Sequence, residues 1–336
     1  MQPLEPKEPF KPIEPLKRIK PLEPFKPMKP IQLIKPTTMA TTEKRLEVLK
    51  TYKIYIGGQF PRTESGRYYV PVNKKGNALA NVCLCSRKDF RDAEVAARNA
   101  FGGWSSRAAF NRGQILYRIA EMLEGRKGQF IEELIKQDAT PAQAEKEVNL
   151  AIDRLIYYSG WCDKFQQVFS AVNPVASPHF NFSVTEPTGV VAAIAPQNNS
   201  LIGLVSLIAP IIAGGNTCII LASATKPLCA VTFAEVLNSS DLPGGVVNIL
   251  TGKVSELLSF FADHMDVNAT VYCEKDAAGQ QLIKEKASLN VKRITLYDTV
   301  DWFAEKAQSP YMIMDFQEIK TTWHPIEIIG GAKAGY

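Results

Sequence analysis

The sequence has 336 residues, 46% of them hydrophobic, and a formal net charge of +5. Residues 1–36 hold eight basic and four acidic side chains, so the rest of the chain is nearly neutral. That near-neutrality argues against a nucleic-acid-binding surface. The length allows one large domain or two smaller ones.

The reactive residue types are few and poorly spaced for metal binding. Six cysteines form no Cys-x-x-Cys pair, and several lie in apolar patterns. We predict buried, free thiols in a reducing compartment. Only three histidines occur, without ligand spacing, which predicts no metal site. No signal peptide is visible and the apolar run after Gly189 is interrupted by Pro196 and Pro210. We therefore expect a cytoplasmic protein that does not contact a membrane.

Residues 1–38 are a proline-rich tail. Proline recurs at every third position up to residue 36, and only Arg18 and Leu33 interrupt the series. Because polyproline II has three residues per turn, one face of such a rod would be proline, one apolar and one charged. We predict that the apolar face docks on a partner or a sister subunit. The alternative is a disordered, low-complexity linker.

Helical patterns dominate the segment between the tail and residue 165. Short extended pieces are expected over 52–60, as a hairpin, and over 68–72. The predicted helices cover residues 42–53, 89–101, 107–124, 129–136 and 142–165.

Residues 166–185 are predicted to be extended, with breaks at Pro174 and Pro178. A protruding ribbon of this kind pairs with another subunit through its exposed edge. The alternative is an ordinary surface loop.

Strands and helices alternate from Gly189 to Leu296. This strict alternation predicts an α/β fold in which helices wrap a parallel sheet, with ligands at the carboxyl ends of the strands. The predicted strands are 189–195, 218–221, 246–250, 269–272 and 291–296, and the predicted helices are 201–213, 227–238, 254–262 and 277–288.

Four long motifs are jointly specific. They are Glu186-Pro-Thr-Gly-Val-Val191, Pro196-x-Asn198-x-x-Leu201, Ala213-Gly-Gly-Asn-Thr217 and Leu242-Pro-Gly-Gly-Val-Val-Asn-Ile249-x-Thr-Gly252. The shorter motif Tyr55-Ile-Gly-Gly58 accompanies them. With them, the chain resembles an aldehyde dehydrogenase from about Tyr52 to Leu296, and most of all the degenerate C-terminal module of the family-sixteen type. The resemblance implies a Rossmann-like NAD(P)-binding domain, an oligomerisation hairpin and a catalytic domain with a cysteine nucleophile.

The resemblance also divides the chain. Residues 39–165 and 186–300 match the NAD(P)-binding domain. Residues 166–185 and 309–328 match the strands that pair with a neighbouring subunit, after a short helix over 301–306. Only 40 residues follow Leu296, and a domain usually needs at least about 50. We therefore expect the catalytic domain to be lacking.

The family's cofactor-binding positions fall on unsuitable residues. Asn198 matches the asparagine of the oxyanion hole, but Gln197 replaces the usual tryptophan. The lysine that bonds the adenosine ribose falls on Leu221, and the glutamate three positions later falls on Ala224. The Gly-Ser pair that faces the pyrophosphate falls on Glu274 and Lys275, where a carboxylate would repel the anion. The vestigial cofactor positions are thus Ala195, Pro196, Gln197, Leu221, Ala224, Glu274 and Lys275. We expect no bound NAD(P).

The catalytic positions are lost as well. The general-base glutamate falls on Tyr297, with Asp298 beside it, and a phenol with a pKa near 10 is a poor base. No cysteine follows Cys273, which we expect to be a packed thiol rather than a substitute nucleophile. We predict no catalytic residue, and Asn198 is vestigial.

Together these features predict a non-catalytic aldehyde dehydrogenase-like subunit that assembles with itself or with an active aldehyde dehydrogenase. One alternative is an NAD(P)-dependent aldehyde dehydrogenase, or a subunit that contributes to such activity in a complex. Another is a module that senses a nucleotide or metabolite in the old cleft.

Overall fold

The computed structural model describes residues 48–326. The predicted polyproline tail, residues 1–38, lies outside the described part. None of the described helices is long and apolar enough to cross a lipid bilayer.

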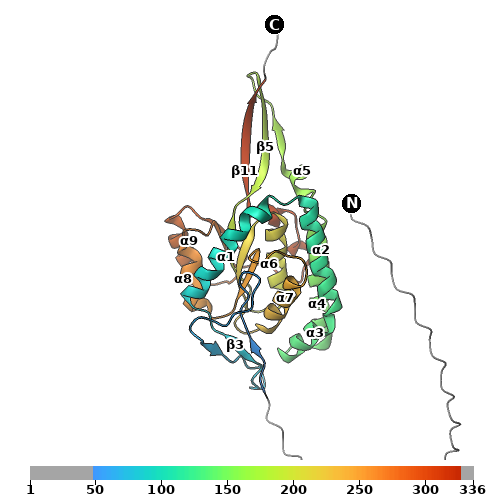
Figure 1. Ribbon diagram of the computed structural model, residues 1–336, viewed down its shortest axis with the longest axis vertical. Helices are drawn as coiled ribbons and strands as arrows, with labels where there is room; N and C mark the ends of the chain where they lie inside the picture. The colour runs from blue at the N-terminus through green and yellow to red at the C-terminus, as the bar shows by residue number, and fades with distance from the viewer. Residues whose placement is uncertain (1–47, 327–336) are drawn as a thin grey trace, which may run out of the picture. The chain divides into compact units, whose positions relative to one another are not determined.

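A five-stranded parallel sheet lies at the centre of the described residues (Figure 1). Its order is β10-β9-β6-β7-β8, and every neighbouring pair is parallel. The predicted α/β class is confirmed. Chain order reverses between β6 and β9, which is where such sheets bind ligands. The strands are β6 (Val190–Ile194), β7 (Thr217–Leu221), β8 (Val247–Leu250), β9 (Ala269–Tyr272) and β10 (Arg293–Leu296).

Helices cover both faces of this sheet (Figure 1). Alternate strand residues explain the two layers: Val191 and Ala193 pack with one set of helices, and Val190 and Ala192 with the other. The first set contains α2 (Ala109–Gly125), α3 (Lys127–Lys136), α4 (Pro141–Ser159), α6 (Ile202–Ala213) and α7 (Leu228–Asn238). The second contains α1 (Arg87–Ser105), α8 (Val254–Asp263) and α9 (Ala277–Ser288).

Helix α6 is buried on all sides, as its apolar circumference predicts. It lies between the sheet and α2 and α4, so no side of it reaches water.

A three-stranded antiparallel ribbon projects beyond the central sheet (Figure 1). Its order is β11-β5-β4, from β4 (Ala171–Asn173), β5 (His179–Pro187) and β11 (Gln317–Pro325). Strands β5 and β11 pair along their full length, from Pro187 opposite Gln317 to His179 opposite Pro325.

The helices differ from the prediction in three segments. The predicted helix over 142–165 ends at Ser159, because residues 160–164 turn and bring Cys162 and Phe165 into the core. Helix α5 (Phe165–Phe169) then occupies the start of the segment predicted to be extended. Helix α10 (Tyr311–Met314) precedes β11, and residues 301–306 give only the short 3-10 helix η1 (Glu305–Ala307).

A second small sheet has the order β1-β3-β2, from β1 (Thr51–Tyr52), β2 (Tyr68–Tyr69) and β3 (Asn81–Cys83). The helix predicted over 42–53 is wrong in its described part, because β1 pairs with β3 and buries Tyr52. Strand β3 was not predicted. The hairpin expected over 52–60 is reduced to a bridge between Ile56 and Gln59.

Candidate functional site

A cleft of about 390 Å³ lies at the carboxyl ends of the central strands. The loops after β6, β7, β9 and β10 line it. It brings together most of the positions that the sequence singled out, although Ala195, Leu221 and Ala224 do not line it. Its lining residues are Pro196, Gln197, Asn198, Thr225, Cys273, Glu274, Lys275, Tyr297, Asp298, Val300 and Trp302.

Gln197 ties the loop after β6 to the loop after β7. Its side-chain amide donates to the carbonyl of Ala195 at 2.9 Å and accepts from the backbone N–H of Ala224 at 2.8 Å. Its own carbonyl accepts from the hydroxyls of Ser223 and Thr225, each at 2.8 Å. Gln197, where the family resemblance would place a tryptophan, thus links the ends of β6 and β7 by hydrogen bonds.

Glu274 holds the same loop from the other side. Its carboxylate accepts a hydrogen bond from the backbone N–H of Gln197 at 2.7 Å. The side chain of Gln280 donates to the carbonyl of Glu274 at 3.2 Å and to the Asp298 carboxylate at 3.0 Å. A carboxylate of the chain itself therefore accepts the hydrogen bond of this backbone N–H at the carboxyl edge of the sheet.

Asp276 occupies the N-terminus of α9. Its carboxylate accepts from the backbone N–H groups of Ala278 at 3.1 Å and Gly279 at 3.0 Å. Free N–H groups at a helix N-terminus bind anions. Here the chain's own side chain already satisfies two of them.

The two positions at the end of β7 offer little to a ligand. Leu221 is fully buried and packs in the core between the sheet, α1 and α8. Ala224 has only its backbone to offer, and Gln197 already accepts its N–H.

Asn198 remains on the cleft lining, and it is exposed. Its carbonyl accepts from the ammonium of Lys226 at 2.8 Å, which fixes the backbone. Asn198 thus lies at the carboxyl edge of the sheet, and its role as a vestigial oxyanion-hole residue stays a prediction.

Tyr297 is a hydrogen-bond donor in this structure. Its hydroxyl donates to the Asp315 carboxylate at 2.5 Å. Burial and the nearby Asp315 carboxylate raise the pKa of Tyr297 far above its ordinary value of 10. The phenol stays protonated at neutral pH, so it cannot accept a proton as a general base.

Cys273 has the environment of a packing residue. It is 7% exposed, and burial followed by the Glu274 charge raises the pKa of its thiol well above 9. The thiolate is the nucleophilic form, and it is rare at such a site. All six cysteines are free and buried, as predicted.

Sequence reasoning missed three side chains that organise this cleft: Asp276, Gln280 and Asp315. The sequence could have indicated the role of Asp276, because an aspartate directly before a helical pattern is a common N-cap. The other two reach the cleft through tertiary contacts and had none.

A family model described as "Aldehyde dehydrogenase family" matches residues 61–297. Cytosolic 10-formyltetrahydrofolate dehydrogenase of Mus musculus is 34% identical over 264 residues, which is 75% of this chain and 29% of that protein. The putative aldehyde dehydrogenase DhaS of Bacillus subtilis is 29% identical over 266 residues, covering 77% of this chain and 53% of that protein.

Solved structures agree with these sequence matches. HpcC from Thermus thermophilus superposes with a TM-score of 0.70 at 25% identity, over 74% of this chain and 48% of that one. PnpE in complex with nicotinamide adenine dinucleotide gives a TM-score of 0.69 at 27% identity, over 73% and 50%. This chain thus spans about half the length of the solved structures it matches. The resemblance to the family-sixteen type stays a prediction. The family itself is shown: this chain belongs to the aldehyde dehydrogenase family.

Proposed function

We propose that this chain is a non-catalytic aldehyde dehydrogenase-like subunit of a cytoplasmic assembly, and that it does not bind NAD(P). The observation that carries the proposal is the hydrogen bond from the backbone amide of Gln197 to the Glu274 carboxylate. Asp276, the N-cap of α9, supports it, because its carboxylate accepts from two further backbone N–H groups that an anionic ligand would otherwise use.

Charge and hydrogen-bonding capacity both oppose the cofactor. Two anions at close range repel each other, and the repulsion grows in a partly buried site. Leu221 cannot donate to a ribose hydroxyl, so the adenosine end of the cofactor loses its anchor too. Lys275 is exposed at the cleft and offsets part of the negative charge only.

The chemistry fails for independent reasons. The Cys273 thiol is buried with a raised pKa, and Tyr297 keeps its proton in a bond to Asp315. Neither residue supplies the nucleophile or the base that aldehyde oxidation requires.

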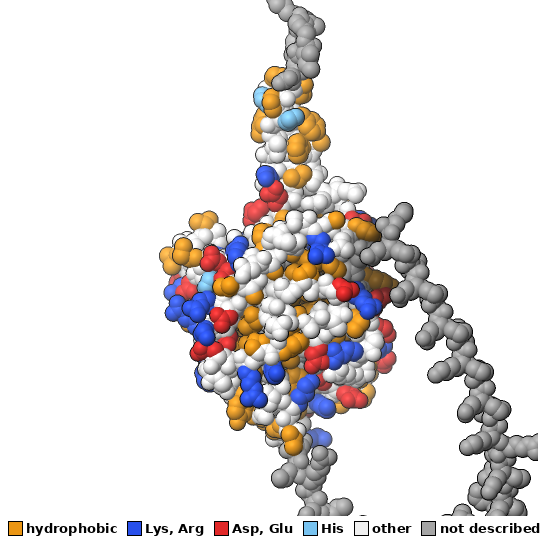
Figure 2. Space-filling view, viewed as in Figure 1, with side chains coloured by type: hydrophobic (Ala, Val, Ile, Leu, Met, Phe, Trp, Pro, Cys, Tyr) orange, Lys and Arg blue, Asp and Glu red, His pale blue; other side chains and the backbone are white. Residues whose placement is uncertain are grey.

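Assembly is the role that the remaining surfaces favour. The ribbon ends in two strand edges, at β4 and β11, which can pair with another chain. Hydrophobic side chains are exposed along it (Figure 2), among them Val172, Phe180 and Trp323. We propose that the partner is a second copy or an active aldehyde dehydrogenase. Docking of the apolar register of residues 1–38 on that partner belongs to the same proposal.

Calorimetric titration of the purified full chain with NAD+ and NADP+ tests the cofactor proposal. We expect no binding heat, whereas an active aldehyde dehydrogenase under the same conditions binds. The double variant Glu274→Gly with Lys275→Ser restores the family's pair and should recover measurable affinity. Wild-type binding as tight as that of the active enzyme, or turnover of an aldehyde by the chain alone, would overturn the proposal.

A contribution to aldehyde dehydrogenase activity within a complex is the second candidate. The exposed Asn198 side chain at the cleft favours it. Co-purification identifies the partner, and Asn198→Ala then separates the two roles. A loss of the complex's activity with the assembly intact would support a catalytic contribution, and unchanged activity would support assembly alone.

A further inference from the structure

Three side chains of metal-ligating type converge outside the cleft described above. Glu94 lies on α1, His264 ends α8, and Asp266 lies in the turn before β9. One donor atom from each, a carboxylate oxygen or a ring nitrogen, lies within 4.8 Å of the other two. Folding thus joins residues that are about 170 positions apart in the chain, which no spacing rule could reveal.

Two of these side chains have a buried polar atom that makes no hydrogen bond within the described residues. Glu94 is 3% exposed, and its Oε1 atom makes no hydrogen bond within the described residues. The Nδ1 atom of His264 is likewise buried and unbonded there. Buried polar groups almost always have a hydrogen-bond partner, so two such atoms without one, on two residues of the same cluster, call for an explanation such as an absent ion.

Arg98, the cation next to this cluster, does not form a hydrogen bond with the Glu94 oxygen. Arg98 Nε lies 3.9 Å from Glu94 Oε1, at the limit of an ion pair. Its guanidinium instead donates to the carbonyl of Asp266 and, at 2.8 Å, to the side chain of Asn268. These bonds hold the backbone of the turn that carries Asp266, and they leave the Glu94 oxygen with a distant ion pair but no hydrogen bond.

We propose that Glu94, His264 and Asp266 form a binding site for one divalent transition-metal ion of the zinc class. An imidazole with two carboxylates is a donor set that suits zinc, and three protein ligands leave a coordination position open. Tetrahedral ligands about 2.1 Å from zinc lie roughly 3.4 Å apart. The donor atoms lie within 4.8 Å of one another, so they would need to draw together by at most about 1.4 Å, and the exposed side chain of Asp266 can rotate to do so.

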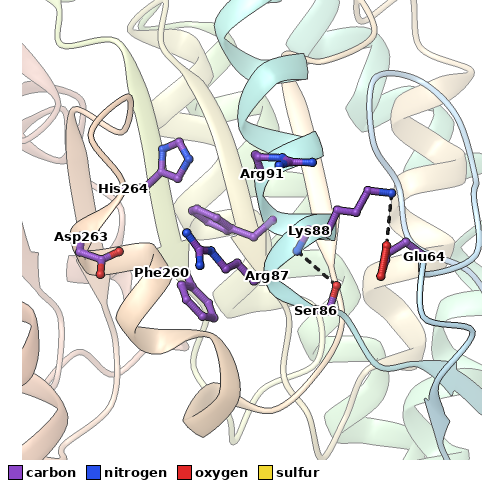
Figure 3. A pocket seen from close by; sticks show the side chains of 9 residues that line it. Glu64, Ser86, Arg87, Lys88, Arg91, Phe260, Asp263 and His264 are labelled. Carbon is purple, nitrogen blue, oxygen red and sulfur yellow. Dashed lines mark hydrogen bonds and ion pairs between the residues drawn. The ribbon is translucent and has the colours of Figure 1, made fainter.

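One of the three proposed ligands, His264, also lines a cleft. The cleft has a volume of about 680 Å³ and lies between α1 and α8. Figure 3 shows His264 and Phe260 on the α8 side of this cleft, and Arg87 and Arg91 on α1. These arginines oppose a bare cation, but they favour an anion as the open-position ligand of the bound metal.

The test uses untagged full-length protein, stripped with a chelator and desalted. Calorimetry with zinc chloride should show one equivalent bound, and cobalt(II) should give visible d–d absorption. Glu94→Gln keeps the side-chain shape, and Asp266→Asn changes an exposed residue, so both variants should fold. We expect each to weaken binding by about tenfold or more. Asp263→Asn is the matched control, because Asp263 lines the same cleft but does not belong to the cluster. The affinity of this variant for zinc should equal that of the wild type.

Three results would overturn the site. The first is no stoichiometric binding by the wild type. The second is undiminished affinity in both Glu94→Gln and Asp266→Asn. The third is loss of binding in His179→Gln, which would place the metal on the ribbon histidines His179 and His324.

Discussion

At the scale of single residues, a buried polar side chain in this chain holds neighbouring elements together by hydrogen bonds. Glu133 on α3 is a buried carboxylate that accepts from the hydroxyls of Tyr52 and Thr232, each at 2.7 Å. These two bonds join β1 and α7 to α3. No sequence pattern pointed to this role, because Glu133 sits in an ordinary helical repeat.

Glu133 should make stability depend on pH. Burial raises its pKa above 4.5, even though the hydroxyls of Thr232 and Tyr52 oppose this effect. A raised folded-state pKa stabilises the fold below the unfolded value, and this contribution is lost as pH rises through the folded value. We expect the unfolding free energy of the wild type to fall relative to Glu133→Gln as pH rises from 4.5 to 8. The fall should be about 1.4 kcal/mol for each pH unit that separates the folded and unfolded pKa values. Urea unfolding at several pH values measures it.

The matched control for this prediction is Glu132→Gln, on the exposed neighbour of Glu133. Its stability curve should run parallel to that of the wild type. A parallel curve for Glu133→Gln as well would contradict the prediction.

Tyr297 provides a second residue-level prediction. If it serves only as the donor to Asp315, Tyr297→Phe should lower the unfolding free energy by about 1–3 kcal/mol, because the Asp315 carboxylate loses its partner. Tyr311→Phe, whose side chain is 67% exposed, should change it little. Chemical denaturation compares the two. Equal stability of wild type and Tyr297→Phe would show that the bond contributes nothing.

At the scale of elements, two glycine motifs pack directly on each other. The turn Gly57-Gly58 after Tyr55 meets Gly244, where an added Cβ would lie 2.6 Å from the Gly57 carbonyl oxygen. Gly58 also has a φ of +81°, which disfavours any side chain. This contact explains why both motifs contain paired glycines. It also seats the turn on β8, where Tyr55 and Ile249 exchange backbone hydrogen bonds.

Gly244→Ala should therefore destabilise the fold. The new methyl group meets backbone rather than a movable side chain, and overpacking of this kind costs about 1–3 kcal/mol. Gly102→Ala is the control, and we expect it to stabilise the fold. Nothing lies within 4 Å of that position on α1, so the better helix former should add up to about 1 kcal/mol. Thermal unfolding of both variants decides, and a neutral Gly244→Ala would refute the backbone contact.

For the whole molecule, the sequence predicted those strands and helices whose limits are set by residues close together in the chain. The limits of β9 and α9 match the predicted 269–272 and 277–288, because buried strands and capped helices carry their signals within a few residues. The strand at Tyr52 was missed because its burial depends on residues distant in the chain, Val82 on β3, Leu228 on α7 and Glu133 on α3. The same limit applies at the candidate sites. Motifs located the cleft, but the bonds of Glu274, and the meeting of Glu94 with His264, depend on the folded chain.

Assembly through the ribbon is the prediction that concerns the whole molecule. Val172 on β4 pairs in register with Phe182 on β5, and Val172 and Phe180 are 68% and 45% exposed. They form one apolar face beside the free edge of β4, with Phe182 and Val184 around a shallow groove. A partner that adds a strand to this edge would cover the face and remove it from water.

The double variant Val172→Ser with Phe180→Ser should therefore reduce the mass of the full-length protein in solution to that of one chain, 37.2 kDa. Light scattering after size exclusion measures the mass. The ribbon strands add nothing to the two cores around the central sheet, so the melting of the variant should stay cooperative. Phe110→Ser is the control, since Phe110 is exposed on α2 outside the ribbon, and it should leave the mass of the assembly unchanged. An oligomer that survives the double variant but dissociates in Phe110→Ser would move the interface from the ribbon to α2.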